Sequence, residues 1–78
     1  MNKREMIEKV IKVLIDEKDM EKHLLRTRKH RYDDAKEDGV SNKMLKLYQE
    51  DIDKKVNKVK ELETLIDFMQ ELHYEEVK

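Results

Sequence analysis

Apolar residues recur every three or four positions along two long segments of the chain. In the second segment the repeat runs over about four heptads, with charged residues between its members. Such spacing places side chains on one stripe of an α-helix and is typical of a coiled-coil seam. The pattern predicts a helix over about residues 42–76, with a stripe made of Leu45, Tyr48, Ile52, Val56, Val59, Leu62, Ile66, Met69 and His73.

The first segment carries a weaker stripe, which predicts a helix over about residues 3–37. Between residues 16 and 23 only Met20 is apolar, while Lys18 and Glu21 fall on the expected apolar face. The helix either continues through this charged run or kinks there, and we favour a continuous helix. The apolar members of the stripe are Ile7, Val10 or Ile11, Leu14, Leu25, Tyr32 and Ala35.

A single break separates the two segments. Gly39 is the only glycine, and the chain has no proline. Glycine tolerates the left-handed conformation that closes a helix, so the Asp38-Gly39 pair predicts the end of the first helix. Ser41 is then a suitable N-cap for the second helix, because its hydroxyl can accept a hydrogen bond from an unpaired backbone N–H. We expect a turn at 38–41 within a single helical-hairpin domain spanning 1–78.

The charge patterns of the two segments match in reverse order. The first segment runs basic, acidic, basic, and the second runs acidic, basic, acidic. If the chain folds back at Gly39, residues whose numbers sum to about 79 become neighbours, and each charged block meets its opposite. The predicted fold class is therefore all-α, a long antiparallel helical hairpin or two-helix coiled coil. The same register pairs Ile7 with Leu72, Leu14 with Leu65, Met20 with Val59, and Tyr32 with Leu47.

Composition adds an argument about assembly. Of the 78 residues, 37% are apolar and 47% are charged, and the net charge is −1. A chain this small and polar buries little apolar surface by itself, and small proteins of this kind rely on disulfides, metals or oligomerisation. Because cysteine is absent, we expect a homodimer in which two hairpins form a four-helix bundle.

The end of the hairpin that carries the chain termini is apolar on more than one face. A helix that is apolar over most of its circumference must be covered on more than one side. A second copy of the chain or a different protein can supply this cover, and the sequence leaves both open. The predicted dimer or partner interface consists of Met6, Ile7, Val10, Val13, Ile15, Leu65, Phe68, Met69 and Leu72.

Residues 22–31 form the most basic run of the chain and hold three of its four arginines. A basic helical face can bind the phosphates of RNA or DNA. The fold-back also places this run opposite the acidic residues of 50–53, so ion pairs within the hairpin compete with such binding. Arginine side chains can also dock the carboxylates of a protein. The candidate contacts to nucleic acid or an acidic partner are Lys22, Arg26, Arg28, Lys29 and Arg31.

Other chemistry is weakly represented. His23 and His30 lie seven residues apart, too far for joint coordination from adjacent turns, and we expect no metal and no cofactor. The sequence has neither a glycine-rich phosphate loop nor a nucleophile elbow, so we expect no catalytic residues and no enzyme activity. No run approaches the roughly 20 apolar residues of a membrane span, and residues 6–15 lack the features of a secretory signal. We expect a cytoplasmic protein that does not bind membranes.

The stretch from Gly39 reads GVSNKMLKLYQEDIDKKV. It resembles the small helical-hairpin phosphatases of sporulating bacilli, which act on the aspartyl-phosphate of a response regulator. Those proteins carry a Ser-Gln-Glu-Leu-Asp motif shortly after a glycine turn. Residues 49–53 occupy its place, where Ile52 and Asp53 agree with the motif and its serine and glutamine are absent. The resemblance covers residues 39–56 and implies a phosphatase in which Asp53 is the residue carried over.

The size and architecture are also similar to those of plasmid- or phage-encoded helical hairpins that bind RNA or host proteins. The function that these patterns favour is a small non-enzymatic regulatory protein, encoded by a phage or mobile element, that binds another protein through a helical face. It would act as a modulator or inhibitor of a cellular partner. Nucleic-acid binding through residues 22–31 and aspartyl-phosphate phosphatase activity are the alternatives.

Overall fold

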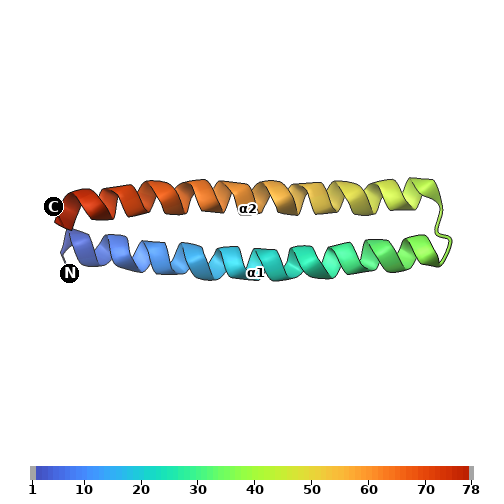
Figure 1. Ribbon diagram of the computed structural model, residues 1–78, viewed down its shortest axis with the longest axis horizontal. Helices are drawn as coiled ribbons and strands as arrows, with labels where there is room; N and C mark the ends of the chain where they lie inside the picture. Colours follow the sequence, from blue (N-terminus) through green and yellow to red (C-terminus); the bar gives the residue numbers. More distant parts are fainter. Residues whose placement is uncertain (1, 78) are drawn as a thin grey trace.

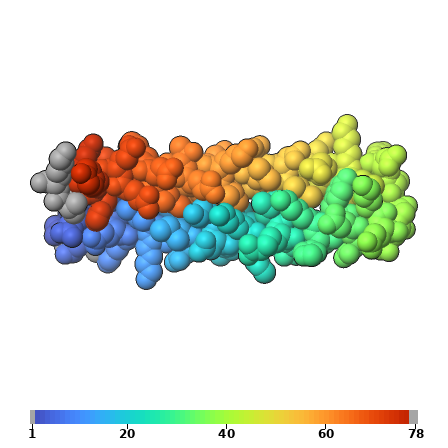
Figure 2. All heavy atoms as spheres, in the orientation of Figure 1, coloured from blue at the N-terminus to red at the C-terminus, as the bar shows by residue number. Residues whose placement is uncertain are grey.

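The computed structural model describes residues 2–77, which form two long antiparallel helices (Figure 1). Helix α1 spans Lys3–Glu37 and helix α2 spans Asn42–Val77. The helices lie side by side in a rod (Figure 2) whose Cα atoms extend over 57 × 15 × 14 Å. No strand occurs within residues 2–77. The predicted all-α antiparallel hairpin is confirmed, and α1 is continuous through its charged middle.

Side chains close the first turn of each helix. At the start of α1, the Asn2 side chain accepts a hydrogen bond from the backbone N–H of Glu5 at 2.8 Å. At the start of α2, the Ser41 hydroxyl accepts one from the N–H of Met44 at 3.4 Å. Each bond satisfies a donor that has no partner within its own helix, and such caps contribute about 0.5–2 kcal/mol. The predicted capping role of Ser41 is therefore observed.

The turn between the helices is a Schellman motif built around Gly39. The N–H of Val40 donates to the carbonyl of Ala35 at 3.1 Å, and the N–H of Gly39 donates to the carbonyl of Lys36 at 3.3 Å. Gly39 has a φ of 76°, in the left-handed region that other residues rarely occupy. Gly39 therefore closes α1 in the way that the sequence predicts.

The core is a narrow seam between the two helices. In α1 its residues follow one another by alternating steps of four and three, as in a coiled coil. They are Ile7, Ile11, Leu14, Lys18, Glu21, Leu25, Arg28, Tyr32 and Ala35. The same alternation in α2 gives Leu45, Tyr48, Ile52, Lys55, Val59, Leu62, Ile66, Met69 and His73. The buried apolar residues of the described chain are Ile7, Ala35, Ile52, Val59, Leu62 and Ile66.

Charged residues occupy part of this seam. Lys18, Glu21 and Arg28 of α1 are half-buried, and so is Lys55 of α2. The Lys55 ammonium lies 2.9 Å from the Glu21 carboxylate, with the two side chains 22% and 14% exposed. This ion pair joins the two helices in the middle of the rod, where the seam lacks apolar residues. The sequence assigned this α2 position to Val56, which is also half-buried.

Ion pairs between the helices confirm the predicted register. The residue numbers sum to 79 for Lys3–Glu76 and for Arg28–Asp51, and to 76 for Glu21–Lys55. Neighbours across the seam are therefore those that folding back at the turn brings together.

Three apolar residues nevertheless point away from the seam. Met20, Leu47 and Leu65 are 61%, 53% and 49% exposed. Met20, Leu47 and Leu65 therefore do not pack inside the seam, and their closeness to Val59, Tyr32 and Leu14 stays a prediction. Each exposed residue immediately precedes a seam residue, so it is rotated by about 100° around its helix.

The hairpin exposes more surface than a compact protein of its mass. Its accessible surface is 6265 Å², whereas a compact monomer of 9.6 kDa exposes about 5,100 Å². The surplus of roughly 1,200 Å² arises because two helices share a single internal interface.

Candidate protein-interaction face

Five large apolar side chains are exposed at the end of the rod where α1 begins and α2 ends. Met6, Val10 and Val13 are 56%, 42% and 63% exposed, and Leu65 and Phe68 are 49% and 56% exposed. We call these five residues the terminal patch. Apolar residues scattered singly are normal on a protein surface, whereas a contiguous group marks an interaction site.

The members of the terminal patch lie on one side of the hairpin. Each immediately precedes a seam residue, as Val10 precedes Ile11. In an antiparallel pair of helices, the positions that precede the seam on the two helices face the same side. The ion pair between Glu17 and Lys58, at 4.0 Å, joins two such positions across the interface. The terminal patch is therefore one surface to which both helices contribute.

The structure reassigns the other residues of the predicted interface. Ile7 is only 6% exposed, so it belongs to the core of the hairpin and is not available to a partner. Met69 and Leu72 are half-buried and lie at the margin of the patch. Ile15 is also half-buried, and because it follows the seam residue Leu14 it lies on the opposite side of the seam from the patch.

Two exposed methionines and one leucine extend the same side of the rod toward the turn. Met20 and Met44 are 61% and 43% exposed, and Leu47 is 53% exposed. The sequence pattern did not predict that these residues belong to an interaction surface. Each of them immediately precedes a seam residue in the sequence. This relation can be recognised only after the seam residues are known.

The two helices carry opposite charge around the terminal patch. Residues 3–15 of α1 contain four basic and two acidic residues, whereas residues 61–75 of α2 contain five acidic residues and neither lysine nor arginine. Lys9 and Glu71 lie beside the patch on the outer edges of α1 and α2, and both are exposed. Within the described part of the chain, neither side chain forms an ion pair.

The basic segment is partly neutralised within the hairpin. The Lys22 ammonium lies 3.8 Å from the Glu63 carboxylate, and one guanidinium nitrogen of Arg28 donates to both carboxylate oxygens of Asp51. The other three basic residues form no ion pair with any residue of the described range. Arg31 lies on the same side of the seam as the terminal patch. Arg26 and Lys29 lie on the opposite side.

A small polar cluster lies at the terminal end, on the side away from the patch. The Nε2 atom of His73 lies 2.9 Å from Oε1 of Glu8, and Nε of Arg4 lies 3.4 Å from the same oxygen. The hydrogen bond with His73 is the main cause that lowers the pKa of Glu8 below its usual value, and the positive charge of Arg4 lowers it further. The cluster joins α2 to α1 near the chain termini.

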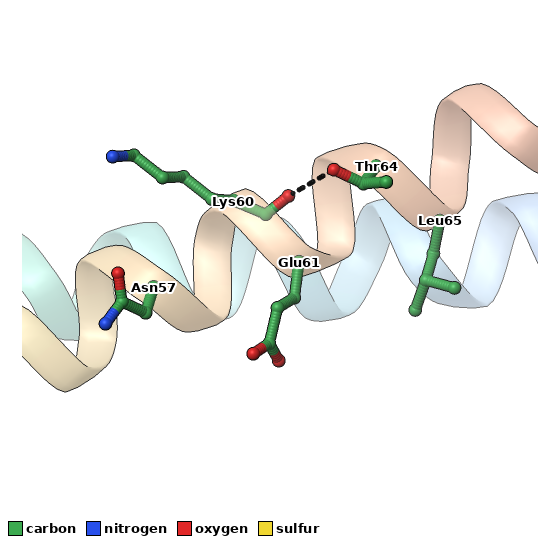
Figure 3. A pocket seen from close by; sticks show the side chains of 5 residues that line it. All are labelled: Asn57, Lys60, Glu61, Thr64 and Leu65. Carbon is green, nitrogen blue, oxygen red and sulfur yellow. Dashed lines mark hydrogen bonds between the residues drawn. The ribbon is translucent and has the colours of Figure 1, made fainter.

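The surface of the rod carries shallow depressions that are open to solvent. One lies on the outer surface of α2 and is lined by residues of that helix alone (Figure 3): Asn57, Lys60, Glu61, Thr64 and Leu65. The Thr64 hydroxyl donates to the Lys60 carbonyl at 3.1 Å. The depression is open to solvent and ends at Leu65, so it adjoins the terminal patch.

The residue that the phosphatase resemblance carries over lies on the outer surface. Asp53 is exposed and accepts a hydrogen bond from the Gln49 amide at 3.0 Å. Among residues 2–77, no three histidine, aspartate or glutamate side chains lie close enough to hold a metal ion.

Comparisons with known proteins give no relative. No family model, curated protein or solved structure matches the chain. No helix within residues 2–77 is long and apolar enough to cross a bilayer. The terminal patch is therefore identified by the geometry of this hairpin alone.

Proposed function

We propose that the chain is a small non-enzymatic protein-interaction module that binds another protein through the terminal patch and thereby regulates it, as a modulator or inhibitor. The supporting observation is the exposure of five large apolar side chains beside a core of only six buried residues. Full burial of such a side chain contributes about 1.5–3 kcal/mol. The patch is thus the largest uncovered source of binding energy that the described chain offers.

The chemistry of the patch suits a helical protein partner. Met6 and Phe68 are long or flat side chains that adapt to an apolar groove, and Val10 and Val13 add rigid contacts. The five members come from two antiparallel helices that lie side by side, so the patch extends along both helices. A partner with an amphipathic helix can lay its apolar face along this surface.

The test is a photo-crosslinking residue placed at Val13 in cells of the source organism. We expect protein adducts from this position that persist after nuclease treatment. The matched control carries the same crosslinker at His23, which is exposed on the outer surface of α1, and should give none of these adducts. Equal adduct patterns from the two positions would overturn the proposal.

The same experiment separates the alternative functions. Adducts that form from residues 22–31 and disappear with nuclease would indicate nucleic-acid binding. If the purified chain hydrolyses an aspartyl-phosphate, and Asp53→Ala abolishes turnover without loss of helical content, the non-enzymatic part of the proposal is wrong. The cytoplasmic location stays a prediction, which fractionation of the source cells measures.

A further inference from the structure

We infer that the occupant of the terminal patch is a second copy of the chain, related by a two-fold axis that runs parallel to the helices. This inference rests on the proposed function, because it concerns the same patch: a second copy covers the terminal patch when no regulated partner is bound there. In this arrangement α1 of each copy packs over α2 of the other, and the chain termini of both copies lie at the same end. All neighbouring helices are then antiparallel, as in a four-helix bundle.

A single hairpin leaves a large area uncovered. The hairpin exposes roughly 1,200 Å² more than a compact monomer of the same mass. A standard protein interface buries about 800 Å² on each partner. The surplus surface of one hairpin is therefore large enough to supply its half of a stable dimer interface.

The charges beside the patch decide how the two copies are oriented. The part of α1 beside the patch has more basic than acidic residues, and the facing part of α2 has acidic residues and neither lysine nor arginine. A two-fold axis parallel to the helices lays the basic edge of each copy over the acidic edge of the other. An axis across the helices would instead lay α1 over α1 and α2 over α2, so that like charges meet. The charges thus select one of the two symmetric ways to join the patches.

The register of the hairpin then identifies one intermolecular pair. Residues whose numbers sum to about 79 lie at the same height along the rod, and the two-fold axis keeps that height. Lys9 of one copy therefore comes level with Glu71 of the other, and each dimer contains this pair twice. Both side chains are exposed and neither forms an ion pair with another residue of the range 2–77, so each is available.

A covered patch also has a consequence for regulation. Any other protein that binds the terminal patch competes with self-association, so its apparent affinity falls as the concentration of the chain rises.

The test begins with sedimentation equilibrium of the purified chain from low to high micromolar concentration. We expect a mass that rises from 9.6 kDa toward twice that value. Phe68→Asp should raise the dissociation constant of the dimer by about a hundred-fold or more, because the single dimer interface loses the buried Phe68 of both copies. Asn57→Asp, which adds the same charge on the outer surface of α2, should leave it unchanged. Circular dichroism of each variant checks that the helices persist.

The orientation is tested by exchanging charges. Lys9→Glu alone and Glu71→Lys alone should each weaken the homodimer, on the order of ten-fold, since each creates two like-charge pairs. Mixing the two variants should restore association, because both pairs in the mixed dimer are then complementary. If Lys9→Glu strengthens the homodimer, or if mixing restores nothing, the parallel axis is wrong.

Failure of this inference is distinguishable from failure of the proposed function. A purified chain that stays at the monomer mass overturns self-association. If the crosslinker at Val13 then still captures a different protein, the terminal patch remains a protein-binding surface with another occupant.

Discussion

The terminal half and the turn half of the hairpin have the same backbone geometry but different side chains. The terminal half, residues 3–20 and 59–77, buries four apolar residues in its seam and exposes the five of the terminal patch. The turn half, residues 21–58, buries only Ala35 and Ile52. Its seam holds half-buried charges instead, and a short turn fixes its helices at one end.

The difference shows where a hairpin of this kind can bind. Two helices cover one stripe on each other, so apolar residues in excess of that stripe remain exposed. The terminal half exposes five such residues in one patch, whereas the turn half exposes Met44, Leu47 and Tyr48 and fills part of its seam with charges. The binding surface therefore lies at the end with the stronger core, and four predictions test this contrast.

The largest effect is expected in the terminal core. Leu62 is only 2% exposed, so Leu62→Ala should lower the free energy of unfolding by about 2–5 kcal/mol. Leu47→Ala removes the same atoms from a side chain that is 53% exposed and should change stability by about 0.5 kcal/mol or less. Urea titrations followed by circular dichroism, at one fixed protein concentration, measure both. Equal losses would mean that the terminal seam is not the core.

The ion pair in the middle of the rod should give the next largest effect. Glu21→Ala leaves the Lys55 ammonium half-buried without its partner and should cost about 1–3 kcal/mol. The double change Glu21→Leu with Lys55→Leu should be neutral or stabilising, because leucines extend the apolar seam. Lys22→Ala serves as control, since its pair with Glu63 is exposed and worth at most about 1 kcal/mol. A double variant less stable than Glu21→Ala would contradict this interpretation.

The stability of variants at Gly39 should depend on the backbone conformation that they can adopt and not on side-chain packing. A Cβ at Gly39 meets no atom within 4 Å, so the cost of Gly39→Ala is that of the left-handed conformation, about 1–2 kcal/mol. Gly39→Asn should cost less, because asparagine adopts this conformation more readily. Thermal unfolding of the two variants measures the difference. An alanine variant as stable as the parent chain would show that the turn is free to change shape.

The smallest effect is expected at Glu8. Its pKa is lowered in the folded chain, mainly by the hydrogen bond with His73. A carboxylate with a lowered pKa stabilises the fold above its unfolded pKa, and this contribution is lost as the pH falls through the folded value. Glu8→Gln should therefore lower the melting temperature slightly at neutral pH and have no effect in strong acid. A difference that persists at low pH would exclude this cause.

The register could be predicted because two patterns in the sequence give the same answer. The charged blocks and the apolar stripes both align around a fold-back at Gly39, and the pair between Arg28 and Asp51 confirms that alignment. The turn could be predicted because only glycine adopts its φ without strain.

The division between core and surface could not be predicted in the terminal half. Between residues 6 and 15 apolar residues occur on nearly every side of the helix, so the stripe fits Val10 and Ile11 almost equally well. The structure places Ile11 half-buried in the seam and leaves Val10 exposed. In the charged middle of α1 the stripe placed Lys18 and Glu21 on the apolar face, and these two side chains are half-buried whereas Met20 is 61% exposed.

The sequence by itself determined the two helices, their turn, their antiparallel register and the surplus of apolar residues at one end. These features follow from local periodicity and from charges matched over long stretches. The tertiary structure alone decided how far each helix is rotated about its axis, and hence that the terminal patch joins Val13 to Phe68 on one side. That rotation is set by the packing of both helices at once, because each seam position is chosen by what fills it from the opposite helix.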